Sequence, residues 1–391
     1  MPKAYAIVNP KRKDSGYPFR GLAGVGVVYK LIQALTIMLE LDEKEYLKYL
    51  DLVCIGTISD IVPLVDENRV IAKLGLKLVE VTKNIGLREL LKSSKYKQID
   101  SNTISFGIAP RINACGRMGH AEEALKLFLT DNIVEAVRIT EKLNEYNTDR
   151  QNMEKKIVKE VLEKINLDDN QNASTIVIGG ENWHHGVIGI VASKITDMFY
   201  KPTILLCFEG DMGKGSGRSV IGFDLHEALC KTSQYLEKYG GHEMAVGLSI
   251  KKQMFEDFKT AFEKCAKECE VEKILPVIKI DAEVDASYIN PEIIKQLNLL
   301  EPFGEANKMP IVIYKGLKID SIRSLSEGKH LKMTLKDGNK WIDAIGFNMG
   351  NLAEEYLIGN KVDVVGVLEI NNFNNREQVQ INIRDIRKAY N

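Results

Sequence analysis

The chain has 391 residues, a length that allows two or three domains, each large enough to bury a core. Its 45% hydrophobic and 27% charged residues are typical of a globular protein and exclude a disordered chain. Because 53 Lys and Arg residues oppose 54 Asp and Glu residues, the net charge is −1, so any binding of nucleic acid must come from local basic groups.

Two further classes of protein are excluded by the sequence pattern. No apolar run approaches the roughly 20 residues that a membrane span needs, and MPKAYAIVNPKRKD is not typical of a secretory signal because its polar cluster follows its apolar run. The six Cys residues form no CxxC pair, and Cys265 with Cys269 is too little for a zinc site. Reduced thiols and a cytoplasmic protein are therefore expected.

The first third of the chain is predicted to be mainly helical. A short strand is expected first, over residues 4–9, followed by a loop with two prolines. Helical patterns then cover residues 21–39, 45–59, 68–83, 86–95, 103–110 and 121–130.

A long polar helix is predicted over residues 133–165, which keep helical spacing without Gly or Pro. At 1.5 Å per residue this helix would be about 50 Å long. Polar helices of this kind usually bridge domains. We therefore expect a first domain over residues 1–131 and a connecting helix over residues 132–166.

Residues 167–273 alternate strand and helix patterns, which favours an α/β domain. Strands are expected over residues 174–180 and 203–208. Helices are expected over residues 187–200, from Asp224 onward and over residues 253–269. A loop is expected at residues 210–219 and a turn at residues 239–247.

Residues 274–391 form short β-rich runs separated by turn signals. The runs cover residues 277–286, 309–325, 330–347, 361–370 and 379–389, with helical inserts at residues 290–299 and 353–356 and turns at Asp337-Gly338 and residues 371–375. Five such runs predict a small β-barrel such as an OB-fold.

Residues 213–219, GKGSGRS, are the segment richest in chemical groups. Glycines such as Gly215 free the backbone to point N–H groups at an anion, Ser216 and Ser219 add hydroxyls, and Arg218 adds a planar donor fork that suits phosphate. The segment predicts a phosphate site. The alternative is a flexible loop with a surface Arg.

Histidine and arginine segments near element ends are further candidates. His184 lies between a predicted strand and a helix, and His242 follows a helix, so both are expected to converge with the Gly-rich loop on one cleft. The alternative for each His is a capping or packing role. Arg111, Asn113 and Arg117, in PRINACGR, predict an anion site at a helix junction, and the alternative is helix C-capping.

Asp60 is a single acid in an apolar run, GTISDIVP. Such an Asp is costly unless it caps a helix, pairs or binds a metal, and a cap is the commoner role. A two-metal phosphodiesterase needs several carboxylates and His around its ions, of which Asp60 would be one.

The chain resembles the RecJ family, the single-stranded-DNA-specific exonucleases of the DHH phosphoesterase superfamily. The resemblance is carried in order by several motifs along essentially the whole chain. They are NPKR and YPF with LAGVGV, DLVCIGTISDIVPL, PRINACGR, LNEYNTDRQ, WHHGVIGIVASK, GSGRS, GGHEMAVG, LEPFGEAN and VQINIRDIR.

This resemblance implies an α/β fold made of the remainder of a DHH catalytic domain, a long connecting helix, a DHH-associated domain over residues 167–273 and a C-terminal OB-fold over residues 274–391. In the same way it implies that Asp60 is a metal ligand and catalytic residue. His184 and His242 match the histidine motifs that line the DNA channel, and the resemblance implies that they too are catalytic residues. Ser216 and Arg218, with Arg117 preferred to Arg111, match the groups that hold a 5′ phosphate.

The chain departs from the family pattern at its N-terminal end. It contains no Asp-His-His triplet and no DxDG motif, which supply most ligands for two Mn²⁺ or Mg²⁺ ions in the family. We therefore expect an N-terminally truncated, inactive piece of a RecJ-like enzyme. Trp341, Tyr314 and Phe347 are candidates for stacking bases in the OB-fold, although core packing is expected for at least two of them.

The function that the resemblance implies is a 5′→3′ exonuclease of single-stranded DNA, acting by metal-assisted hydrolysis in recombination and repair. Its expected partners are single-stranded DNA with a 5′ end, a single-strand-binding protein and a RecQ-like helicase, and the chain is expected to be a monomer without a membrane partner. The alternatives are a non-catalytic single-strand-binding fragment and a DHH-family phosphodiesterase acting on short oligonucleotides. The OB-like part and PRINACGR argue against the last of these.

Overall fold

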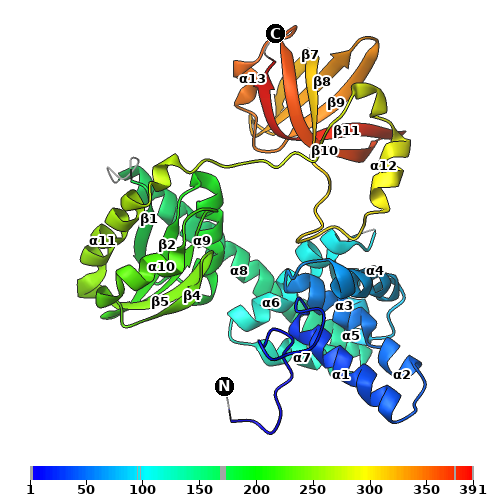
Figure 1. The fold of residues 1–391 in the computed structure, drawn as a ribbon, viewed down its shortest axis with the longest axis vertical. Helices are drawn as coiled ribbons and strands as arrows, with labels where there is room; N and C mark the ends of the chain where they lie inside the picture. Colours follow the sequence, from blue (N-terminus) through cyan, green and yellow to red (C-terminus); the bar gives the residue numbers. More distant parts are fainter. Residues whose placement is uncertain (1–2, 95, 97, 168–172, 374–375, 390–391) are drawn as a thin grey trace. The chain divides into compact units, whose positions relative to one another are not determined.

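The computed structural model (Figure 1) describes residues 3–94, 96, 98–167, 173–373 and 376–389. The chain divides into two compact units. The first unit comprises Met1–Val81, Gln98–Ser105 and Ile278–Asn391, and the second comprises Thr82–Lys97 and Phe106–Val277. None of the helices in the described ranges combines the length and the apolar character that crossing a membrane requires.

The helical part of the first unit contains α1 (Gly24–Met38), α2 (Lys44–Leu47), α3 (Leu50–Ser59) and α4 (Asp66–Glu80). Leu22, Tyr29, Leu50, Val53 and Ile71 form its core. The single helix predicted over residues 45–59 is two helices, because the chain turns at Lys48 and Tyr49 before the buried face of α3 begins.

The strand predicted over residues 4–9 is wrong. These residues have no regular structure, and Tyr5 and Val8 are exposed. A strand needs a neighbour to accept its backbone hydrogen bonds, and no other part of the described chain pairs with this segment.

The second unit begins with helices that prepare the site. They are α5 (Ile85–Ser94), α6 (Ala109–Arg117), α7 (Ala121–Leu129) and α8 (Ile133–Leu167). A π-helical turn (Thr103–Ile108) leads into α6 and begins in the first unit, which includes Ser105. The predicted long helix is confirmed as α8, a single helix of 35 residues. Its first half packs on α5, α6 and α7, and its second half packs on α9 (His185–Phe199).

The α/β part of the second unit is a five-stranded sheet in the order β1-β2-β3-β5-β4 (Figure 1). Its strands are β1 (Ile176–Glu181), β2 (Thr203–Glu209), β3 (Met212–Arg218), β4 (Lys238–His242) and β5 (Ala245–Lys251). The pair β1–β2 is parallel and the other pairs are antiparallel. Helices α8 and α9 cover one face, and α10 (Leu225–Lys231) and α11 (Phe255–Glu268) cover the other.

The loop predicted over residues 210–219 is wrong, because β3 occupies most of it. Gly213, Gly215 and Gly217 alternate along β3 and face the core under α10 and α11. A Cβ at these three positions would lie only 2.7–2.9 Å from Phe208, Leu248 and Val246 respectively. The glycines therefore make room for bulky neighbours, and their N–H groups belong to the sheet. Likewise, the turn predicted over residues 239–247 is the β4–β5 hairpin.

The C-terminal part of the first unit is a closed barrel, which confirms the predicted OB-like fold. Its strands are β6 (Ala282–Glu283), β7 (Val312–Leu325), β8 (His330–Asp337), β9 (Lys340–Gly346), β10 (Lys361–Phe373) and β11 (Arg376–Lys388), with α12 (Pro291–Asn298) and α13 (Leu352–Glu355) as inserts. The sheet order is β10-β11-β9-β8-β7-β6, and the pairing of β10 with β7 closes the barrel.

Two predicted features of the barrel differ in detail. The run at residues 277–286 contributes only the two residues of β6. The turn at Asp337-Gly338 is confirmed between β8 and β9, whereas β10 continues through Phe373 and residues 374–375 of the other predicted turn lie outside the described residues.

Candidate functional site

Strand β3 places three polar side chains on the face of the sheet that α9 covers. Ser216 pairs in register with Leu205 and Arg218 pairs with Thr203 on β2. Leu205 belongs to the core under α8 and α9, so Lys214, Ser216 and Arg218 share its face of the sheet. The alternation that buries the glycines of β3 thus presents its polar residues to α9.

Helix α9 leaves space for these side chains at Gly189. A Cβ at Gly189 would lie 2.9 Å from Ser216 Oγ and 3.2 Å from Arg218 Nη2. Arg218 Nη1 donates hydrogen bonds to Ser216 Oγ (3.1 Å) and to the carbonyl oxygen of Gly217 (2.7 Å). Burial, followed by the neighbouring Arg117, lowers the pKa of Arg218.

Arg117 comes to this site because the end of α6 packs against the start of α9. Its Nη1 donates a hydrogen bond of 3.1 Å to the carbonyl oxygen of Gly186. A Cβ at Gly186 would lie 2.6 Å from the backbone oxygen of Arg117, so the close approach requires Gly. Loss of hydration, followed by the charge of Arg150, lowers the pKa of Arg117.

His184 caps α9, as the capping alternative expects. Its Nδ1 accepts a hydrogen bond of 3.1 Å from the backbone N–H of Gly186, and its ring stacks on His185 with centroids 5.1 Å apart. Burial, followed by the charge of His185, lowers the pKa of His184. The same side chain lines a cavity of about 710 Å³ between α8 and the ends of β1 and β2.

His242 lies two strands from Arg218, at the end of β4. Both residues pair in register with Ala245 of β5. Two residues along the strands, Ser216 of β3 pairs with Gly247 of β5, which pairs with Gly240 of β4. A Cβ at Gly240 or Gly247 would meet no atom within 4 Å. We call Gly240 and Gly247 the glycine surface, since they leave bare, exposed backbone next to Ser216.

Other candidates of the second unit lie in structural contacts. Arg111 joins α6 to α8, since its Nε donates to Asn144 Oδ1 (2.7 Å) and its Nη1 donates to the carbonyl oxygen of Gly107. Burial lowers the pKa of Arg111. Asn113 is exposed on α6. The position of Arg117, and not that of Arg111, favours an anion site.

Ser219 and Gly215 are also used by the fold. Ser219 is buried, and its Oγ donates a hydrogen bond of 2.7 Å to the carbonyl oxygen of Phe223. Gly215 faces the core on the side of the sheet opposite Ser216. We leave both residues out of the site proposed below.

Asp60 belongs to the first unit, where it is exposed and follows the last residue of α3. In the part of the chain that the structure describes, no group of three His, Cys, Asp or Glu side chains lies close enough together to hold a metal ion. Asp60 by itself does not supply the several ligands that a divalent ion requires. The described residues therefore do not fit a metal centre.

The barrel carries two exposed aromatic side chains, Trp341 on β9 and Phe347 just after it. Trp341 and Phe347 are 59% and 50% exposed, while Tyr314 is 1% exposed and belongs to the core. The expectation that at least two of the three pack in the core is therefore wrong. Lys336 Nζ lies 4.8 Å from the ring centroid of Trp341, and the ring of His330 meets that of Phe347 edge-on at 5.4 Å.

Basic residues lie on the same outer face, on β7 and β8. Lys318 pairs in register with Lys336, and Arg323 pairs with Lys332. Lys332 Nζ lies 3.3 Å from Asp343, the acid that it contacts on this face. We call Trp341, Phe347 and these four basic residues the basic barrel face. Backbone phosphates and stacked bases are the ligands that such a combination suits.

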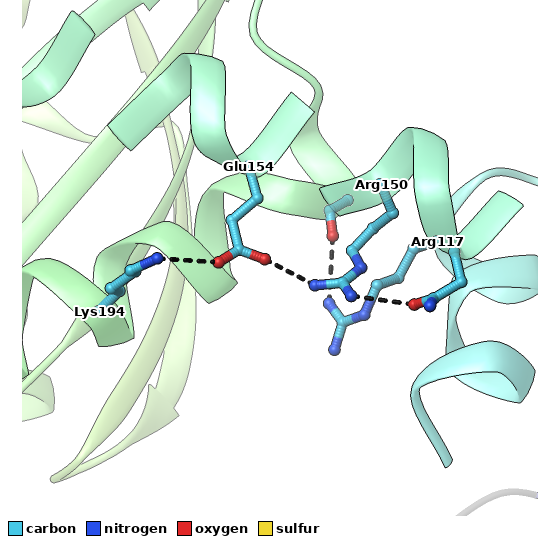
Figure 2. Close-up of polar contacts among 6 residues, drawn as sticks. Arg117, Arg150, Glu154 and Lys194 are labelled. Atoms are coloured by element: carbon cyan, nitrogen blue, oxygen red, sulfur yellow. Dashed lines mark hydrogen bonds and ion pairs between the residues drawn. The ribbon is translucent and has the colours of Figure 1, made fainter. Parts of the chain in front are cut away.

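The sequence prediction missed a charged group beside Arg117. Arg150 of α8 lies next to Arg117 and pairs with Glu154, which also pairs with Lys194 of α9 (Figure 2). LNEYNTDRQ contains Arg150, but a charged position on a polar helix is more often solvated than functional. Gly186 and Gly189 were also missed, although WHHGVIGIVASK contains both.

Comparisons with known proteins agree with this architecture. Residues 169–268 match a family model described as the DHHA1 domain, and residues 280–385 match the RecJ OB domain. A crystal structure of RecJ in complex with Mn²⁺ from Thermus thermophilus superposes with a TM-score of 0.84 at 32% sequence identity, covering 96% of this chain and 54% of that one. A second structure of the same protein, in complex with Mg²⁺, also has a TM-score of 0.84.

Two curated relatives are named single-stranded-DNA-specific exonuclease RecJ. The protein from Bacillus subtilis (strain 168) is 37% identical over 98% of this chain and 49% of its own length. The protein from Salmonella typhimurium is 31% identical over 99% of this chain and 70% of its own length. The chain thus spans about half the length of the Bacillus subtilis relative. Sequence and fold are shared along nearly all of the chain, which therefore belongs to the RecJ family.

Proposed function

We propose that the second unit binds the phosphorylated 5′ end of single-stranded DNA, and that the chain serves a RecJ-type 5′→3′ exonuclease in this way. One observation carries the proposal. Arg218 donates to the Ser216 hydroxyl, the charge of Arg117 is near enough to help lower the pKa of Arg218, and neither guanidinium has a carboxylate partner among the residues that the structure describes. Clustered, partly desolvated arginines without acids are stabilised by an anion.

A terminal phosphate suits this arrangement. The guanidinium groups of Arg117 and Arg218 are planar donors that match phosphate oxygens, and Ser216 Oγ adds a third polar group. The glycine surface beside Ser216 leaves room for the sugar and base that follow the phosphate. Holding the 5′ end in this position would orient the first phosphodiester bond, which gives the 5′→3′ polarity.

The described residues do not form a centre that could hydrolyse a phosphodiester bond. In the proposed enzyme, Asp60 would be one ligand of a centre that uses Mn²⁺ or Mg²⁺. The described residues provide no cluster that could supply the other ligands of that ion. We therefore assign binding and orientation, and no chemical step, to this chain. A single-strand-binding protein and a RecQ-like helicase remain predicted partners.

The barrel is proposed to hold the strand beyond its 5′ end. The basic barrel face combines four cationic side chains with two exposed aromatic rings. The cations would follow the backbone while the rings stack on bases, which is binding without sequence preference.

Fluorescence anisotropy tests the proposed function. The purified chain is titrated with a 3′-labelled 20-nucleotide strand that carries either a 5′ phosphate or a 5′ hydroxyl, with Mn²⁺ present. We expect tighter binding of the phosphorylated strand, by about tenfold or more, since hydrogen bonds to charged groups contribute about 1.5–3 kcal/mol each. Binding should weaken as salt rises.

Two results would count against these assignments. Equal affinity for the two strands would refute the phosphate site. Release of labelled nucleotides by the pure chain would refute the conclusion that its residues form no metal centre, and it would also exclude a fragment that only binds.

A further inference from the structure

The turn that follows Asp60 has a backbone conformation that is unfavourable by itself. Ile61, the next residue, has a φ of 55°, in the left-handed region that a β-branched residue rarely adopts. Its side chain is 73% exposed, so burial of this side chain does not offset the strain. Asp66, at the far end of the turn, has a φ of 48°. Such a conformation is stable only where neighbouring groups hold it.

One group that holds the turn comes from α4. Asn68 is buried, and its Nδ2 donates hydrogen bonds to the carbonyl oxygens of Pro63 (3.0 Å) and Gly21 (2.7 Å). These bonds tie the middle of the turn to the segment that precedes α1. They do not fix the next residue, Leu64, which is held by a distant part of the chain.

That distant part is the segment LEPFGEAN, residues 300–307. The backbone N–H of Leu64 donates a hydrogen bond of 2.7 Å to the carbonyl oxygen of Glu305. The side chain of Leu64 is buried, and a Cβ at Gly304 would lie only 2.6 Å from Leu64 Cδ1. Gly304 therefore leaves the space that Leu64 fills. The two residues are 240 positions apart in the sequence, yet both belong to the first unit.

Residues 300–307 are themselves fixed by several polar contacts. Asn307 Nδ2 donates a hydrogen bond of 2.8 Å to the carbonyl oxygen of Pro302, and Gly304 and Asn307 exchange backbone hydrogen bonds of 3.0 and 3.2 Å. Arg69 Nη2 on α4 donates a hydrogen bond of 3.3 Å to the carbonyl oxygen of Glu301. A segment fixed in this way can hold a strained partner in place.

We propose that residues 300–307 act as a clasp that keeps the turn in its strained conformation and thereby positions Asp60. Leu64 and Gly304 are positioning residues, because the contact between them fixes the turn. The contacts of Leu64 offset the strain at Ile61, and without them the turn would relax and shift the backbone of Asp60. The clasp belongs to the first unit and the proposed phosphate site belongs to the second, so either assignment can fail without the other.

Hydrogen exchange of the full-length chain, followed by mass spectrometry, tests the clasp. Gly304→Val is compared with Gly16→Val, a matched control in the same unit, where a Cβ would meet no atom within 4 Å. Gly304→Val is expected to raise the exchange rate of amides in residues 60–66 by about tenfold or more, because it forces Leu64 and its N–H away from the clasp. The rates in α1 and β8 should stay at the parent values, and Gly16→Val should change none of these rates.

Two outcomes of the exchange experiment would overturn the proposal. If Gly304→Val raises exchange equally over residues 60–66, α1 and β8, it destabilises the whole unit and does not release a clasp. If the folded Gly304→Val chain keeps the parent rate over residues 60–66, the clasp does not hold the turn.

A second pair of variants tests the strain if Gly304→Val does not fold. Ile61→Gly is compared with Ile37→Gly, which replaces an Ile that is 69% exposed within α1. Since Gly adopts the left-handed region without strain, Ile61→Gly is expected to raise the melting temperature by about 2–4 °C in calorimetry. Ile37→Gly should lower it, because Gly disfavours a helix. A melting temperature that Ile61→Gly leaves unchanged or lowers would show that the clasp holds no strain.

Discussion

Ser216 and Arg218 are the residues whose replacement tests the phosphate site most directly. Arg218→Gln is expected to weaken binding of a 5′-phosphorylated strand roughly 10- to 100-fold, because it removes a hydrogen-bonding charge. Ser216→Ala is expected to weaken it about 2- to 10-fold, as the loss of one neutral hydrogen bond predicts. Binding of a 5′-hydroxyl strand should change much less in both variants when it is measured by anisotropy.

The control for this prediction is Arg88→Gln. Arg88 is also in the second unit, on α5, where it is exposed and makes a long contact of 3.7 Å with Glu89. If Arg88→Gln weakened phosphorylated strands as much as Arg218→Gln does, the effect would come from total charge and not from a site.

The residues of this site are easier to predict than the conformation that holds them. A cluster of Gly, Ser and Arg indicates Ser216 and Arg218 as anion-binding candidates from local composition. The same glycines suggest a loop, because the bulky side chains that require small residues at these positions come from distant parts of the sequence. Gly215 makes room for Leu248, which is 33 residues away and touches β3 only once the sheet has formed.

At the scale of elements, the site depends on how closely α6 approaches α9. Gly186→Ala would place a Cβ 2.6 Å from the backbone oxygen of Arg117, an atom that cannot move alone. We expect a loss of about 1–3 kcal/mol in the free energy of unfolding, as for other overpacked contacts. Urea unfolding followed by Trp183 fluorescence, in a Trp341→Phe background, measures this loss in the second unit.

Gly116→Ala is the matched control for Gly186→Ala. Gly116 lies in α6, next to Arg117, and a Cβ there would meet no atom within 4 Å. Replacing a helical Gly by Ala is expected to stabilise the chain by about 0.5–1 kcal/mol. Equal effects of the two substitutions would show that the contact between α6 and α9 is not as close as we describe.

Elements with a local signal are predicted well, and elements that depend on distant partners are not. Helix α8 follows from uninterrupted helical spacing. Residues 4–9 have a strand-like pattern, yet they form no strand because nothing in the described chain pairs with them. The ion pairs of Arg150 and Glu154 with one another and with Lys194 are not predicted either, since the contact with α9 depends on packing between two helices.

At the scale of the whole molecule, a net charge of −1 conceals two basic surfaces, one in each unit. The arginine cluster lies in the second unit and the basic barrel face lies in the first. Composition alone predicts neither, because acidic residues elsewhere cancel their charge. Since these surfaces are proposed to bind different parts of a strand, their contributions to affinity should be separable by mutation.

Trp341→Ala and Phe347→Ala test that separation. Each is expected to weaken binding of a 20-nucleotide strand by about 1–3 kcal/mol, the contribution of one stacked base. Each should leave the preference for a 5′ phosphate unchanged, because that preference is assigned in our proposal to Arg117, Arg218 and Ser216 of the second unit. Tyr288→Ala is the control, since Tyr288 is 59% exposed but lies outside the basic barrel face. Two results would contradict the proposal of two independent binding surfaces. One is a Trp341 or Phe347 variant that loses the preference for a 5′ phosphate, and the other is Tyr288→Ala weakening binding as much as these variants do.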